Sequence, residues 1–213
     1  MRRLLFGLAL LACGPAWAGD TVTTKHVTAR LVADVASVRA RQTARVGLQL
    51  TIIPGWHTHW RNPGDAGAPP ALAWTISEGA TVGPLAFPTP TPLAEGPLMT
   101  YAHTGTPLLV APLTVAHPPA ALRLHADWLV CQEVCVPEQG DFALDLPADD
   151  GAASPNAPLF RAAAEALPRP APGSATVTPD DVLTLRDPAL TPASVKAARF
   201  VPDTPDTLND AAP

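Results

Sequence analysis

Two cysteines four positions apart are the residues of this sequence best suited to covalent chemistry. Cys131 and Cys135 lie within the segment WLVCQEVCVPE, residues 128–138. Thiols can form a disulfide and exchange it with the thiol of another protein. In an extended strand the two α-carbons would be about 13 Å apart, whereas a disulfide needs roughly 4.4–6.8 Å. A bridged pair therefore requires a turn, and we expect it in a loop between two strands.

The same spacing leaves a structural disulfide open as the alternative to a redox-active one. A bridge that closes so short a loop contributes only about 2 kcal/mol in the chain-entropy model. Structural disulfides in β-sandwiches join strands that are distant in sequence, which this pair cannot do. The spacing therefore favours exchange with a partner's thiol over a purely stabilising role.

The charges around the pair predict a weakly reactive dithiol. Glu133 and Glu138 flank the cysteines, and no lysine or arginine lies between Arg123 and Arg161. Nearby negative charge raises the pKa of a thiol above its usual value of about 8.5. We therefore expect the free thiols to alkylate slowly, and the disulfide to be attacked by a stronger thiolate on a reducing partner.

Two histidines form a weaker candidate site. His57 and His59 are two residues apart, so both side chains share one face of a strand. Further soft or borderline ligands for a copper or zinc ion are His103, Met99 and the two cysteines. The simpler interpretation, which we favour, is that Trp56 and Trp60 pack while the histidines stay partly exposed. No metal is assigned on this basis.

The remaining polar residues have structural interpretations. Asn62 and its neighbours Arg61 and Asp65 are expected to order the turn at Pro63-Gly64. His26, His117 and His125 occur in isolated contexts and are expected at the surface.

The first 18 residues are typical of a secretory signal peptide. Arg2 and Arg3 precede an apolar run at residues 4–12, and Ala16-Trp17-Ala18 provides a cleavage site. The run is shorter than the roughly 20 residues that span a bilayer. Residues 10–13 (LLAC) also resemble a lipid-attachment motif at Cys13, which we consider a minor alternative. We therefore expect export to an oxidising compartment, the periplasm, where disulfides form.

The chain between residues 20 and 147 has the pattern of an antiparallel β-sandwich. Short alternating segments at residues 44–52, 108–115, 121–130 and 142–146 are separated by proline and glycine. Pro112 suggests that the second of these is an edge strand or carries a bulge. The following residues, 148–178, have the composition of a linker with a short helix at 159–167. The segment 179–213 is too short to form a core alone, so either it packs on the first domain or it begins a longer segment.

The composition excludes several classes of protein. The 27 prolines rule out an all-helical bundle. A net charge of −5 with only 14 basic residues argues against binding to nucleic acid.

Three motifs resemble the N-terminal periplasmic domain of the DsbD/ScsB family of transmembrane thiol:disulfide reductases, in particular the ScsB-like copper-sensitivity suppressor branch. They are PGWHTHWRNPGD at residues 54–65, Tyr101 with Gly105, and DWLVC to CVPE at residues 127–138. The resemblance covers about residues 30–147 in order. The tail around residues 197–200 (AARF) also resembles the start of the family's next periplasmic segment.

The resemblance implies an immunoglobulin-like domain whose cysteine pair takes electrons from a thioredoxin-like domain and reduces periplasmic proteins. By position, Cys135 would form the mixed disulfide with the partner and Cys131 would resolve it. The segment Met99-Thr100-Tyr101-Ala102-His103 falls where the family has a cap loop that shields the sulfurs, so Met99, Tyr101 and His103 are the expected shield. Such a module needs no cofactor, and we expect a monomer.

The sequence departs from the family's full-length pattern because the transmembrane electron conduit and the C-terminal thioredoxin-like domain are missing. The chain is therefore expected to act as a fragment or as a relay module served by separate proteins. The competing function is a non-enzymatic copper-binding or copper-tolerance protein with a passive disulfide, and an adhesive or scaffolding sandwich is a third possibility.

Overall fold

The computed structural model describes residues 19–170, 172–178, 180, 182–188, 190–191, 195 and 199–205. The predicted signal peptide, including Cys13, lies outside this part of the chain, and so do residues 197 and 198 of the tail motif. In the part that is described, no helix is long and apolar enough to cross a membrane.

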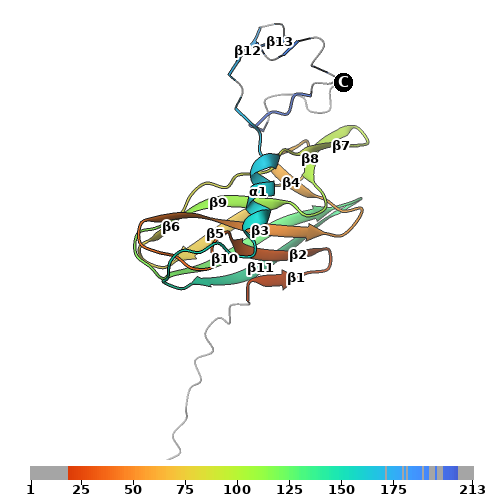
Figure 1. The fold of residues 1–213 in the computed structure, drawn as a ribbon. Coiled ribbons are helices and arrows are strands. Elements are labelled where there is room, and N and C mark those ends of the chain that lie inside the picture. The colour runs from red at the N-terminus through yellow and green to blue at the C-terminus, as the bar shows by residue number, and fades with distance from the viewer. Residues whose placement is uncertain are drawn as a thin grey trace, which may run out of the picture.

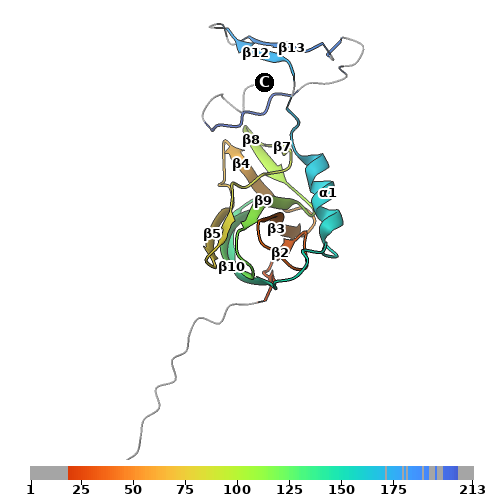
Figure 2. The same cartoon turned by 60° about the vertical axis from the view of Figure 1, so that its left-hand side comes forward.

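Two antiparallel sheets form the body of the molecule (Figures 1 and 2). The larger sheet has the order β1-β2-β3-β9-β6, with bounds Thr21–Thr23, Val27–Ala33, Gln42–Ile52, Leu108–Val115 and Ala80–Val82. The smaller sheet has the order β11-β10-β5, with bounds Cys135–Leu146, Ala120–Cys131 and Ala71–Ile76. Their facing side chains form one core, in which Leu48 and Leu50 of the larger sheet join Trp128 and Phe142 of the smaller.

Strand β10 shows why this sequence forms a sandwich. Leu122, Leu124 and Ala126 are fully buried, while the alternating Arg123 and His125 reach toward solvent. Such a period of two places one side chain in the core and the next outside. The predicted alternation of residues 121–130 is therefore confirmed.

Strand β9 differs from the prediction of an edge strand, because it lies between β3 and β6. Its proline is tolerated for a local reason. Strand β6 ends at Val82, and the backbone N–H of Gly83 donates to the carbonyl of Pro112 at 2.8 Å. The missing N–H of the proline thus faces a position where the neighbouring strand has already ended.

A third sheet, in the order β4-β8-β7, adjoins the sandwich, with bounds Thr58–Gly64, Leu98–His103 and Thr91–Glu95. The expectation that residues 99–103 form a loop is therefore wrong, because these residues belong to strand β8. Strand β7 pairs with it through a two-residue turn at Gly96-Pro97, where Gly96 has φ +63°. A positive φ is readily adopted by glycine, which allows this tight hairpin.

The chain after the sandwich returns to it twice. Helix α1 (Ala157–Ala166) lies against the outer face of the larger sheet (Figure 2), where Phe160 packs with Val32 and Leu108. Strands β12 (Ser174–Val177) and β13 (Leu183–Arg186) form a separate hairpin. Farther along, Asn62 Nδ2 donates to the carbonyl of Pro202 at 2.9 Å. Part of the tail therefore packs on strand β4 of the first domain.

Candidate functional site

The hairpin between β10 and β11 positions the cysteine pair. Cys131 is the last residue of β10, Cys135 is the first of β11, and the two are direct cross-strand partners. The intervening residues 132–134 make the turn that brings the α-carbons to 4.1 Å, and the sulfurs are joined in a disulfide. The pair thus lies at the end of the longest hairpin of the sandwich.

The two cysteines have very different exposure. Cys131 is only 2% exposed, whereas Cys135 is exposed and follows Val134, which is 66% exposed. Disulfide exchange requires an in-line approach of the attacking thiolate to one sulfur, so access decides which sulfur is attacked. The geometry therefore makes Cys135 the cysteine that an incoming thiolate can reach.

Two backbone hydrogen bonds attach His57 to Cys131. The N–H of His57 donates to the carbonyl of Cys131 at 3.0 Å, and the N–H of Cys131 donates to the carbonyl of His57 at 2.9 Å. Two residues further, Nε2 of His59 lies 3.9 Å from Sγ of Cys131. The rings of the two histidines meet edge to face with centroids 5.4 Å apart. The predicted shared face of the two histidines thus lies against the buried sulfur.

The expectation that these histidines stay partly exposed is wrong, because His57 is 4% and His59 1% exposed. The expected surface position of His26 is wrong as well, since it is 3% exposed and its Nδ1 lies 2.7 Å from Glu138 Oε1. In each case a partner distant in sequence covers the ring. Local sequence context does not reveal such long-range pairing.

Burial keeps the histidines near the site in their neutral form. It lowers the pKa of His59 to about 4, with a smaller lowering from neighbouring His57. Burial also lowers the pKa of His57, against an opposing effect of Glu95, whose Oε1 lies 3.7 Å from His57 Nε2. A neutral imidazole with its proton on Nε2 can instead donate a hydrogen bond to Cys131 when that sulfur is a thiolate.

The side chain of Glu138 is held away from the sulfurs, which modifies the predicted electrostatics. It accepts hydrogen bonds from the hydroxyl of Thr24, from the backbone N–H of His26 at 3.2 Å and from Nε1 of Trp128 at 3.4 Å. Of the two carboxylates, the one next to the disulfide is therefore that of Glu133, which is exposed in the turn. The expected slow alkylation rests on Glu133 and on the lack of basic residues in this segment.

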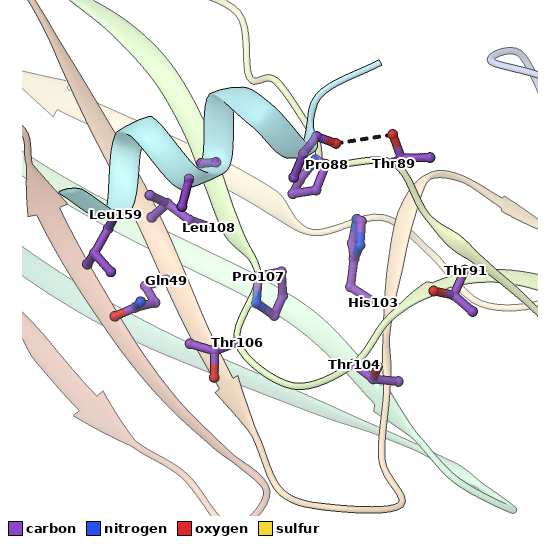
Figure 3. Close-up of a pocket in the computed structure, with 13 residues that line it drawn as sticks. Gln49, Pro88, Thr89, Thr91, His103, Thr104, Thr106, Pro107, Leu108 and Leu159 are labelled. Carbon is purple, nitrogen blue, oxygen red and sulfur yellow. Dashed lines mark hydrogen bonds between the residues drawn. The ribbon is translucent and has the colours of Figure 1, made fainter. Parts of the chain in front are cut away.

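The three residues expected to shield the sulfurs lie in two different places. Tyr101 is 4% exposed and meets Trp60 edge to face at 6.5 Å, and Met99 packs against the same core. His103 instead lines a cavity of about 350 Å³ beneath α1, together with Leu108 and Leu159 (Figure 3). Burial lowers its pKa to about 4. Shielding by Met99 and Tyr101 stays a prediction.

The polar residues of strand β4 support its ends. Oδ1 of Asn62 accepts the N–H of Gly64 at 3.0 Å. The expected turn at Pro63-Gly64 is wrong, because both residues belong to strand β4, whose pairing with β8 is irregular here. Asp65 accepts the N–H of Met99 at 2.7 Å, and Arg61 pairs with Asp203 at 3.1 Å. These contacts attach β4 to β8 and to the tail.

Sequence reasoning missed two residues of the site. Glu95 reaches His57 from the end of strand β7, and no sequence signal links the two. Gly67 has φ +92°, and a Cβ there would lie 2.0 Å from Nε2 of His59. The closely spaced glycines 64 and 67 were the available signal for this close approach.

Comparison with known proteins identifies a family and similar folds. The model of a family described as "Thiol:disulfide interchange protein DsbD, N-terminal" matches residues 27–147. The N-terminal periplasmic domain of ScsB from Proteus mirabilis is similar with a TM-score of 0.58 and 19% identity, over 78% of this chain and 66% of that one. The reduced N-terminal domain of DsbD from Neisseria meningitidis has a TM-score of 0.35 and 13% identity, over 58% and 89%. No curated protein sequence matches the chain.

The comparison with ScsB shows a shared fold, and the predicted immunoglobulin-like sandwich is confirmed. The predicted family is confirmed by the match over residues 27–147. This chain spans 66% of the ScsB structure it resembles.

Proposed function

This chain belongs to the family of the N-terminal domain of the thiol:disulfide interchange protein DsbD, and from that membership we propose that it relays electrons in the periplasm. Its Cys131–Cys135 pair accepts two electrons from a thioredoxin-like domain of a transmembrane reductase and passes them to substrate proteins. The observation that carries the proposal is a disulfide at a hairpin end, with one cysteine exposed and the other buried beside a histidine.

The first step reduces the module. A thiolate of the reduced partner attacks Sγ of Cys135, which forms the mixed disulfide and releases Cys131 as a thiolate. The partner's second thiolate then attacks the partner's first sulfur in the mixed disulfide, and Cys135 leaves as a thiolate. The partner ends as a disulfide, and the module ends as a dithiol after taking up two protons.

The second step passes the electrons on. The thiolate of Cys135 attacks a disulfide of the substrate protein and forms a new mixed disulfide. Cys131 then attacks Sγ of Cys135, re-forms the internal disulfide and releases the reduced substrate. The direct cross-strand pairing keeps the two sulfurs close throughout, because backbone hydrogen bonds rather than the disulfide fix the positions of both strands.

His59 is the residue placed to assist Cys131. Its Nε2 lies 3.9 Å from the buried sulfur, and the neutral ring, with its proton on Nε2, can donate a hydrogen bond to the thiolate of Cys131. That thiolate forms when Cys131 leaves the disulfide and again when Cys131 attacks the mixed disulfide. Since Cys131 has little contact with water, such a donor would stabilise the thiolate more here than at exposed Cys135.

The predicted alternative combines a copper site with a passive disulfide. While the disulfide is intact, Cys131 offers no thiolate, and the cluster retains only two imidazoles for a metal. Zinc sites use three or four protein ligands, and Cu⁺ prefers soft thiolate or thioether sulfur. A permanently oxidised pair is therefore a poor partner for a metal site, and this favours the exchange function.

A trapping experiment tests the proposed roles. In a Cys131→Ser variant, Cys135 attacks a substrate disulfide but no internal thiol resolves the product. We expect this variant to accumulate disulfide-linked adducts in periplasmic extract, seen on non-reducing gels and released by reductant.

The matched control is Cys135→Ser, whose remaining thiol is buried and should form few adducts. Equal trapping by both variants, or adducts from the Cys135→Ser variant alone, would contradict the assigned roles. Partners are identified by mass spectrometry of the released chains.

A further inference from the structure

Three potential metal ligands converge where the disulfide meets strand β4. One ligand atom each from His57, His59 and Cys131 all lie within 4.8 Å of one another, and all three residues are buried. Nε2 of His57 has no hydrogen-bond partner among the described residues. A buried polar nitrogen without a partner costs free energy that a ligand can recover.

One ligand separation is close to that of a metal-bound pair, and the others lie within 4.8 Å. Zinc binds sulfur at about 2.3 Å and imidazole nitrogen at about 2.0–2.1 Å, so a tetrahedral angle sets these ligands about 3.6 Å apart. Sγ of Cys131 and Nε2 of His59 are 3.9 Å apart. A small rotation of either side chain would bring them to the required separation.

The backbone holds these ligands in place before any ion binds. The paired hydrogen bonds between His57 and Cys131 fix two of the three positions. Strand β4 carries His59 two residues on, where it pairs with Ala102 of β8. Ligands fixed on strands lose little entropy on binding, which favours a rigid site over one on a flexible loop.

We propose that the reduced form of this protein binds one thiophilic d¹⁰ ion, Zn²⁺ or Cu⁺, through His57, His59 and the thiolate of Cys131. The site exists only after a dithiol reductant has transferred two electrons to the disulfide and has itself become a disulfide. The ion then replaces the thiol proton of Cys131, which passes to solvent. The inference needs a reducible disulfide and does not require exchange with any particular partner.

Both ions suit the charge and the number of ligands of this site. The thiolate of Cys131 and the carboxylate of Glu95, which lies 3.7 Å from His57 Nε2, together balance the two charges of Zn²⁺. Zinc completes four ligands with water or another donor, whereas Cu⁺ is satisfied by three soft or borderline ligands. Binding of both ions in separate experiments therefore supports the same site.

The site would couple metal binding to the redox state. An ion that binds only the dithiol stabilises it, so a free concentration 100 times the Kd shifts the reduction equilibrium about 100-fold. For a two-electron couple this change corresponds to about 59 mV. Bound metal would also withhold Cys131 from the resolving step and pause electron transfer.

The primary test uses the full chain and the metal alone. We titrate Zn²⁺ against a chromogenic chelator, and Cu⁺ against a Cu⁺-specific chelator without oxygen, for oxidised and reduced protein. We expect one ion per chain in the reduced protein and none in the oxidised protein. A Cys135→Ser variant, which cannot form the disulfide, should bind without reduction, because Cys135 is not among the ligands.

Three substitutions test the assigned ligands. Cys131→Ser, His57→Gln and His59→Gln should each weaken binding at least 10-fold, whereas the exposed His125→Gln should bind as wild type does. Near-ultraviolet circular dichroism of the oxidised variants verifies that each is folded. If a variant does not fold, a measurement on reduced wild type replaces it. The absorption spectrum of Co²⁺ bound to that protein reports whether one or two thiolates bind the metal.

The outcomes separate this inference from the proposed function. No binding to reduced protein, unchanged binding in both histidine variants, or a spectrum with two thiolates would each overturn the metal site. Metal binding with no disulfide exchange by the metal-free protein would instead contradict the relay function alone. Exchange without metal binding would leave the relay intact and refute this inference.

Discussion

Reduction of the disulfide should cost the protein only a little stability. The bridge joins residues separated by 4 in sequence, so it closes a loop of about five residues. The chain-entropy relation then gives an entropy change of about −7 cal/mol/K for the unfolded chain, which corresponds to about 2 kcal/mol of stability at 25 °C. The hairpin keeps its remaining support, since the paired strands run from Ala120 opposite Leu146 down to the cysteines. His57 also stays hydrogen-bonded to the backbone of Cys131.

Urea denaturation followed by tryptophan fluorescence measures this cost. We compare the oxidised protein, the reduced protein and the double variant Cys131→Ser/Cys135→Ser. Reductant should lower the free energy of unfolding of wild type by about 2 kcal/mol. The double variant should be close to the reduced protein and should not respond to reductant, which controls for effects of the reductant itself.

Two results would refute the reasoning. Global unfolding on reduction, or a loss above about 5 kcal/mol, would make the bridge a structural staple, since removal of such disulfides from small domains costs that much. A reduced protein as stable as the oxidised one would show that loop closure does not govern this bridge. A modest loss is what a relay requires, because it must stay folded in both states.

Four further outcomes follow from the same geometry. Burial lowers the pKa of His59 and of His103 from the ordinary histidine value of 6.5 to about 4 in the folded protein. The folded state therefore loses stability as the pH falls from 6.5 toward 4, because the unfolded chain binds these protons first. Each of the two histidines should lower the free energy of unfolding by about 2 kcal/mol between pH 7 and pH 5. In urea denaturation, the His103→Phe variant should therefore lose less stability than wild type over this pH range. An equal loss would contradict this account. Gly67→Ala should destabilise the protein by at least about 1 kcal/mol, because the residue has φ +92° and its Cβ would collide with His59. The displaced His59 should also slow reduction of the disulfide by a thioredoxin-like protein. Wild-type stability and rate would rule out the close contact. Tyr101→Ala should lower the free energy of unfolding by about 3 kcal/mol, because it removes a ring that is 4% exposed. If the ring shields the sulfurs, a small thiol should reduce the disulfide of this variant faster than that of wild type. An unchanged rate would exclude shielding. The reduced cysteines should react slowly with iodoacetamide at neutral pH and faster after Glu133→Gln, whereas fast, thioredoxin-like alkylation of wild type would contradict the electrostatic argument.

Local patterns were enough to predict the sandwich and the position of the disulfide. Strand β10 alternates because each residue of an extended strand faces opposite its neighbour, and this depends on nothing distant in the chain. The cysteine spacing requires a turn for the same local reason. The expected loop at residues 99–103 failed because strand β8 is set by pairing with two other strands, which no short window of sequence records.

By itself, the sequence determined which residues can carry the chemistry: two thiols close enough to bond, in a segment without basic residues. The tertiary structure decided what surrounds them. Burial of Cys131 and the approach of His59 accompany the pairing of His57 with Cys131, residues separated by more than 70 positions. Such contacts arise from the packing of whole sheets, so only the folded chain shows which thiol is reached from outside and which is held beside an imidazole.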